Sequence, residues 1–194
     1  MDIPAFVTGR AEKALEAERL GFRFERVDLE LVEIQSLDPS EVADSKAREA
    51  YAKLKRPVLV EDSGLAIRAW GGFPGALVKW LERSAGLEAM ARMLDAFPDR
   101  SAAAVCAAAY CDGLRVIAGR GEASGAIAPS PRGGGGFGWD SLFVPDGEER
   151  TFAEMSGAEK DRVSHRRRAW EALARQLPEL QGRKTGNGRL EPKK

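Results

Sequence analysis

The alanine-rich segment from Ser101 to Gly125 limits the fold of this chain more than any other part of the sequence. Its longest apolar run, Ala102–Cys111, has 10 residues, and a membrane-spanning helix needs about 20. Alanine favours helix, but Asp112-Gly113 stands between two apolar runs and is a strong hairpin signal. We therefore predict two antiparallel strands here, a third strand that ends near Ile127, and no membrane span.

Helices and short strands are predicted before this hairpin. Residues 3–7 form a strand, Thr8-Gly9 a turn, and residues 11–20 a helix that Gly21 stops. A second helix begins at Asp38-Pro39, because Asp38 is a good capping residue and proline suits the first helical position. It ends near Lys55, before Pro57. Residues 58–60 then form a short buried strand that carries Glu61-Asp62-Ser63 at its carboxyl end.

The rest of the chain continues the same mixed pattern. Two short helices follow the breaker cluster GGFPG at 71–75. After the loop PRGGGGFG we expect a short strand at Leu142–Val144, a turn at Pro145-Asp146-Gly147 and a helical segment that ends before Pro178. Residues 1–180 are thus predicted to form a single α/β domain, and residues 181–194 a disordered basic tail.

Composition excludes several classes of protein. The chain has 194 residues, 43% of them hydrophobic, which suffices for the core of one domain. Equal totals of 30 basic and 30 acidic residues argue against a polybasic nucleic-acid coat. Residues 160–194 nevertheless carry 11 Lys and Arg against 4 Asp and Glu, so an anion site should draw on this segment.

The first residues lack the basic and apolar pattern of a secretion signal, which predicts a cytoplasmic location. Cys106 and Cys111 are interpreted as buried apolar residues.

Two segments in the N-terminal half carry residues suited to binding phosphate or the metal ion that accompanies it. The residues from Thr8 to Lys13 join a strand to a helix N-terminus, where free N–H groups and the helix dipole attract anions. An ordinary capped helix is the alternative. Carboxylates such as Glu61 and Asp62 suit Mg²⁺, although solvated acids at a strand end would give the same pattern.

Two further segments suggest a binding pocket. The glycine-rich loop that ends in Phe137, Trp139 and Asp140 indicates close approach of a ligand to the backbone, or else two core anchors beside a flexible loop. The lone histidine, His165, begins a run of arginines, which is typical of a solvated basic helix face or, with little aromatic interleaving to support it, of RNA binding.

Taken together and in order, these motifs resemble those of the inosine triphosphate pyrophosphatase family over roughly residues 5–177. The shared motifs are TGxxxKxxE from Thr8, VEDSGLAIRAWGGFPG (60–75), FGWD (137–140), TFAEM (151–155), EKD (159–161) and SHRRRA (164–169). The resemblance implies an elongated mixed β-sheet with flanking helices that form two lobes around a central cleft, and a homodimer. It also implies hydrolysis of the non-standard purine nucleotides ITP, dITP and XTP to the monophosphate and pyrophosphate, with Mg²⁺ as cofactor. We expect no nucleic-acid partner, because the net charge is zero and the basic cluster has little aromatic interleaving.

The resemblance assigns roles residue by residue. Asp62 corresponds to the residue that activates water and binds metal, and Glu33 to the second metal carboxylate. The phosphate or nucleotide positions are Thr8, Gly9, Arg10, Ala11, Glu12, Lys13, Lys46, Ser63, Lys79 and Lys160. The base pocket falls on Phe137, Gly138, Trp139, Asp140, His165 and Arg166.

Three residues depart from the family pattern. Arg10 replaces the usual asparagine and brings a permanent cation, Pro4 should delay the first strand or leave it beside an unpaired edge, and Ser141 stands where proline is common. Two other functions stay open: a Maf-like pyrophosphatase for modified pyrimidine nucleotides, which lacks the FGWD and SHR motifs, and a nucleotide sensor without turnover.

Overall fold

The structure, a computed structural model, describes residues 3–180, so the tail predicted at 181–194 lies outside the described residues. Within these residues, seven strands form one mixed sheet in the order β2-β1-β3-β5-β6-β7, and β4 pairs with β3 off this path. The strands are β1 (Ala5–Val7), β2 (Glu25–Val27), β3 (Val58–Ile67), β4 (Pro74–Gly75), β5 (Ser101–Cys111), β6 (Val116–Ile127) and β7 (Phe143–Pro145). The helices are α1 (Ala11–Arg19), α2 (Pro39–Leu54), α3 (Val78–Ala85), α4 (Leu87–Met93), α5 (Gly157–Val163) and α6 (His165–Gln176). Single 3₁₀ turns cover Arg68–Trp70, Gly138–Ser141, Phe152–Glu154 and Pro178–Leu180.

The predicted hairpin is confirmed and forms the centre of the sheet. β5 and β6 pair without a break from Ser101↔Ala126 to Cys111↔Val116. At the turn the Asp112 carboxylate accepts from the Leu114 N–H at 3.0 Å, and Gly113 has a φ of +89°, which glycine adopts without strain. The prediction of a separate third strand is wrong. The residues that lead to Ile127 form the second half of β6, which pairs with β5 without a break as far as Ala126.

β3 is longer than the sequence indicated. The prediction ended this strand at Val60, with the acidic residues at its tip, but it continues to Ile67 because every residue from Val58 to Ile67 pairs with β5. Glu61, Asp62 and Ser63 therefore lie in the middle of a strand. Since side chains alternate along a strand, Glu61 and Ser63 point to one face of the sheet and Asp62 to the other.

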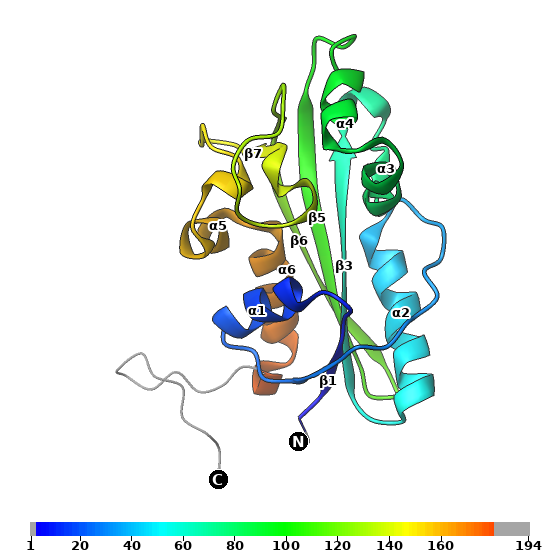
Figure 1. Ribbon diagram of the computed structural model, residues 1–194. Coiled ribbons are helices and arrows are strands. Elements are labelled where there is room, and N and C mark those ends of the chain that lie inside the picture. Colours follow the sequence, from blue (N-terminus) through cyan, green and yellow to red (C-terminus); the bar gives the residue numbers. More distant parts are fainter. Residues whose placement is uncertain (1–2, 181–194) are drawn as a thin grey trace.

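Helices cover both faces of the sheet, as Figure 1 shows. On one face the alanines of α2, Ala43, Ala47 and Ala50, pack against Val58 and Val60. The other face is covered by α1 and α6, whose core includes Ala17, Trp170 and Leu173 together with Phe6 and Leu59. The Asp38 cap of α2 is confirmed, since its carboxylate accepts from the Ser40 N–H at 2.9 Å.

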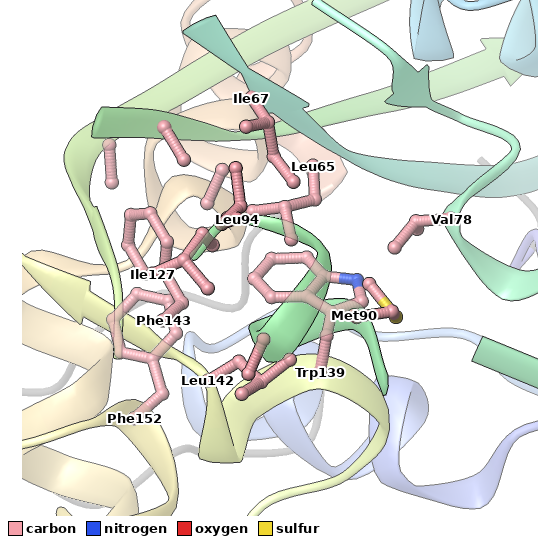
Figure 2. Close-up of a cluster of buried hydrophobic side chains, with 14 of the residues drawn as sticks. Leu65, Ile67, Val78, Met90, Leu94, Ile127, Trp139, Leu142, Phe143 and Phe152 are labelled. Atoms are coloured by element: carbon pink, nitrogen blue, oxygen red, sulfur yellow. The ribbon is translucent and has the colours of Figure 1, made fainter. Parts of the chain in front are cut away.

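A third hydrophobic cluster lies at the other end of the long strands. Figure 2 shows the Trp139 ring inside this cluster, near Leu65, Met90 and Phe143. α3 and α4 contribute to the same cluster, so the glycine-rich loop is anchored to them through Trp139.

The late start of β1 after Pro4 is confirmed, but β1 is no edge strand, because it pairs with β2 and β3. Within residues 3–180 no helix has the length and apolar character needed to cross a membrane.

Candidate active site

A cavity of about 750 Å³ opens where β3, the start of α1, α3, the glycine-rich loop and the start of α6 meet. Most residues singled out from the sequence line it: Thr8, Gly9, Arg10, Lys13, Glu33, Lys46, Asp62, Ser63, Lys79, Phe137, Gly138, Trp139, Asp140, His165 and Arg166. Ala11 and Glu12 are exposed on α1 and do not belong to the lining. Lys160 is buried behind Phe137, with its ammonium 4.9 Å from the centre of that ring.

Two carboxylates and two lysines form the acidic part of the cavity. Lys46, on α2, lies 3.3 Å from Asp62 and 3.4 Å from Glu33, and it also donates to the main-chain oxygen of Glu61 at 3.2 Å. Lys79, on α3, pairs with the other Glu33 oxygen at 3.0 Å. The loop before α2 thus brings Glu33 to the same place as a residue from the middle of β3.

Asp62 has one oxygen without a partner. Its Oδ2 is buried and forms no hydrogen bond with any residue that the structure describes. Burial raises the pKa of Asp62 against the opposing charges of Lys46 and Lys13. An orphaned carboxylate oxygen beside a second carboxylate is the oxygen chemistry that a hard divalent cation prefers.

These donors fit a magnesium ion that shares its coordination with substrate. Among residues 3–180 no group of three or more His, Cys, Asp or Glu side chains is placed to hold a metal. Mg²⁺ commonly takes one or two carboxylates and completes its shell with water and substrate phosphates. Asp62 and Glu33 meet that requirement, whereas a metal site built from protein ligands alone would need more donors.

Glu61 serves a different purpose from its neighbour Asp62. Its carboxylate accepts from the Arg166 Nε at 2.9 Å and from the Trp170 indole N–H at 2.9 Å, and it lies 3.3 Å from the Lys13 ammonium. Although burial opposes ionisation, Arg166 and Lys13 lower the pKa of Glu61 to about 2. Although both carboxylates suit Mg²⁺, Glu61 and Asp62 do not share one site, because they face opposite sides of β3.

A chain of buried charges continues from Glu61 to the glycine-rich loop. Arg166 pairs with Glu16 as well as with Glu61, and Glu16 accepts from Lys160 at 2.9 Å. Lys160 in turn donates to Asp140 at 2.6 Å, and that carboxylate also accepts from the Phe137 N–H at 2.9 Å. The network fixes Phe137 and Asp140 relative to β3 and α1, so the predicted base pocket and the predicted phosphate region are connected directly.

His165 lies at the bottom of this pocket. Its ring stacks on Phe152 with 5.9 Å between centroids, and Trp139 lies 5.4 Å away. Both ring nitrogens are buried and have no hydrogen-bond partner among residues 3–180. Burial and the charges of Arg166 and Lys160 hold the pKa of His165 well below its usual range, so the ring is neutral and presents one donor and one acceptor.

α1 begins without a side-chain cap. The Arg10 N–H reaches the Thr8 hydroxyl at 3.2 Å, but no side chain accepts from the first N–H groups inside the helix. Free N–H groups at a helix N-terminus attract anions. The ordinary capped helix, which the sequence left open, is therefore not what forms here.

Sequence reasoning gave no role to several residues of the site. Glu16 is the last residue of the first motif and lies three residues after Lys13 on α1. This spacing could have indicated that Glu16 faces the site together with Lys13. Trp80, Glu82 and Arg83 line the cavity from α3. Nothing in the sequence alone distinguishes these three residues from those on the exposed face of an ordinary helix.

Comparison with known proteins agrees with this geometry. Residues 5–176 match the sequence profile of the Ham1 family. The dITP/XTP pyrophosphatase of Methanopyrus kandleri is 41% identical over 174 residues, which cover 87% of this chain and 93% of that protein. Inosine triphosphate pyrophosphatase 1 of Trypanosoma cruzi is 45% identical over 151 residues, 77% of each chain.

A solved structure supports the same assignment. A HAM1 protein from Coxiella burnetii superimposes with a TM-score of 0.78 and 29% sequence identity, over 92% of this chain and all of that one (100%). The motifs, the fold and the sequence match agree, and the chain belongs to the Ham1 family.

Proposed function

We propose that this protein is a nucleoside triphosphate pyrophosphatase that hydrolyses ITP, dITP and XTP to the monophosphate and pyrophosphate with the help of Mg²⁺. The observation that carries the proposal is the pair Glu33 and Asp62, held around Lys46 with one Asp62 oxygen unpaired, in the same cavity as an uncapped helix N-terminus. The names of the relatives support the substrate class.

Asp62 and Glu33 are the residues that would hold the metal. Mg²⁺ bound there supplies positive charge to the triphosphate and makes a coordinated water more acidic. Asp62 also orients the attacking water and accepts its proton, for which a raised pKa is suited. Lys46 keeps the two carboxylates together and contributes a cation of its own next to the reacting phosphate.

The remaining cations stabilise the charge of the departing pyrophosphate. Lys79 reaches the cavity from α3, and Lys13 reaches it from α1 beside the free N–H groups of that helix. Such fixed donors and charges lower the barrier because they need not reorganise during the reaction. Of the residues named as phosphate or nucleotide contacts, Ala11, Glu12 and Lys160 do not line the cavity, so we assign this role only to the others.

The base pocket recognises the edge of the purine. Hypoxanthine and xanthine present an acceptor at O6, where adenine presents an amino donor. The neutral His165, with two unpaired ring nitrogens, and Arg166 are the donors available at the bottom of the pocket. Arg166 is already bound to Glu16, Glu61 and Ser63, so it reads the base without leaving its carboxylate partners.

The products of ITP hydrolysis test this proposal. Incubation of the protein with ITP and Mg²⁺, followed by phosphorus NMR, should yield IMP and pyrophosphate in equal amounts. IDP and inorganic phosphate as products would mean attack on the terminal phosphate and would overturn the proposal. The proposal extends to a homodimer in the cytoplasm, and the mass of the protein in solution, measured by light scattering, checks the dimer.

A further inference from the structure

Two opposite charges face each other across the mouth of the cavity without forming an ion pair. The guanidinium of Arg10, at the start of α1, lies 5.7 Å from the centre of the Phe137 ring. Glu82, on α3, lines the same cavity. Among residues 3–180 neither side chain has an ion-pair partner within 4.0 Å.

Gly138 shows how near the two groups are. A Cβ atom at this residue would lie 3.6 Å from the Arg10 Nη1 and 3.5 Å from the Glu82 Oε2. Both side chains therefore lie against the same side of one glycine in the loop that forms the base pocket. A small movement of either brings them into contact.

The two residues belong to parts of the molecule with separate cores. α1 packs with Trp170 and Phe6 in one hydrophobic cluster. α3 packs through Val78 in the cluster that contains Trp139. A contact between Arg10 and Glu82 would join these two parts directly over the glycine-rich loop.

The three lysines that line the cavity differ from Arg10, because each has an ion-pair partner. Lys13 is paired with Glu61, Lys46 with Asp62 and Glu33, and Lys79 with Glu33. Glu82 likewise differs from Glu33, Glu61 and Asp62, each of which has a basic partner. Arg83 and Glu30 also line the cavity without an ion pair among residues 3–180, but it is Arg10 and Glu82 that meet at Gly138.

We propose that Arg10 and Glu82 form an ion pair across the cleft when a nucleotide is bound, and that Glu82 is a positioning residue that holds Arg10 over the nucleotide. This inference rests on the proposed function, since it takes the nucleotide as the ligand of the cavity. For removal of the Glu82 carboxylate, it predicts weaker nucleotide binding, whereas charge repulsion alone would predict tighter binding. A carboxylate near a polyanionic substrate should weaken binding, so its removal should help, whereas loss of a positioning contact should hurt.

The experiment compares Arg10→Gln, Glu82→Gln, the double variant and the exchange R10E/E82R. Glu88→Gln, on an exposed position of α4 outside the cavity, is the matched control for removal of a carboxylate. Binding of ITP is measured by calorimetry without divalent cation, and kcat and KM for ITP are measured with Mg²⁺, both at low and high salt.

We expect Glu82→Gln to weaken ITP binding and raise KM about threefold to fivefold at low salt, with kcat within about twofold of wild type. The double variant should bind ITP no more weakly than Arg10→Gln, the exchange should recover part of the loss, and Glu88→Gln should match wild type. The differences should shrink at high salt, because exposed charges are screened.

Tighter ITP binding by Glu82→Gln, or losses that simply add in the double variant, would overturn the ion pair. If the wild type binds ITP with this coupling but releases no pyrophosphate, the proposed function fails and the ion pair stands. If the wild type does not bind ITP, both fail.

Discussion

Glu61 and Asp62 are neighbours on β3 with opposite effects on stability. The pKa of Glu61 is lowered, because two cations and an indole N–H outweigh the cost of burial, and the pKa of Asp62 is raised by burial. A carboxylate with a lowered pKa stabilises the fold, and one with a raised pKa destabilises it at neutral pH. We therefore predict that Glu61→Gln destabilises the protein more than Asp62→Asn does, because Lys46 keeps Glu33 as a partner when Asp62 is neutralised, and that Asp62→Asn abolishes turnover.

The magnitude for Glu61 follows from its pKa. A decrease from 4.5 to about 2 corresponds to about 3 kcal/mol of unfolding free energy, at 1.36 kcal/mol for each pKa unit. Removing one partner of a buried ion pair typically costs about 3–5 kcal/mol, because Arg166 and Lys13 keep their charges. In a domain of this size the loss should lower the melting temperature by about 6–12 °C.

Urea denaturation at pH 7, with thermal melting as a second measure, tests the pair of variants. Because the pKa of Glu61 is lowered, its contribution is complete above pH 4.5 and is lost as the pH falls towards 2. The gap between wild type and Glu61→Gln should therefore narrow between pH 4.5 and pH 3. A loss below about 1 kcal/mol at pH 7, or an equal loss in Asp62→Asn, would refute the reasoning.

Three further predictions concern other parts of the molecule. His165→Gln should flatten the dependence of melting temperature on pH between 7 and 5. The buried imidazole is neutral in the folded protein, so its contribution to stability is complete above the ordinary pKa of 6.5 and is lost as the pH falls. Parallel curves for the two proteins would contradict this. Gly121→Ala should cost about 1–3 kcal/mol or more of unfolding free energy in urea, because its Cβ would overlap the α6 backbone at His165 and Ala169, whereas Gly134→Ala, which has open space, should not. Glu33→Gln should raise the Mg²⁺ concentration needed for half-maximal pyrophosphate release, and an unchanged titration would remove Glu33 from the metal site.

Local signals in the sequence predicted the elements that depend on local chemistry. Asp38 and Pro39 start α2 as expected, and Asp112-Gly113 turns the central hairpin. These residues act on their own backbone within a few positions, so their effect does not depend on distant partners.

The sequence did not predict elements whose extent depends on residues far away in the chain. β3 continues through Glu61 and Asp62 because a long run of small residues on β5 lies beside it and charged partners come from α1, α2 and α6. The three-residue strand β2 was not predicted, since its pairing with β1 follows from tertiary contact and not from its own pattern.

The candidate site shows the same division. Most residues that the family motifs single out line one cavity, but which of them are paired depends on residues that meet only in the fold. Glu16 is an example, because its partners Lys160 and Arg166 follow it by about 150 positions in the chain. Such ion pairs cannot be inferred from spacing.

The release of pyrophosphate from a panel of nucleotides with Mg²⁺ tests the central claim most directly. We expect kcat/KM for ITP, dITP and XTP to exceed that for ATP and GTP by about 10- to 100-fold or more, since a buried donor left unpaired costs about 1–3 kcal/mol. Equal values for ITP and ATP, or a preference for dTTP or UTP, would contradict the account.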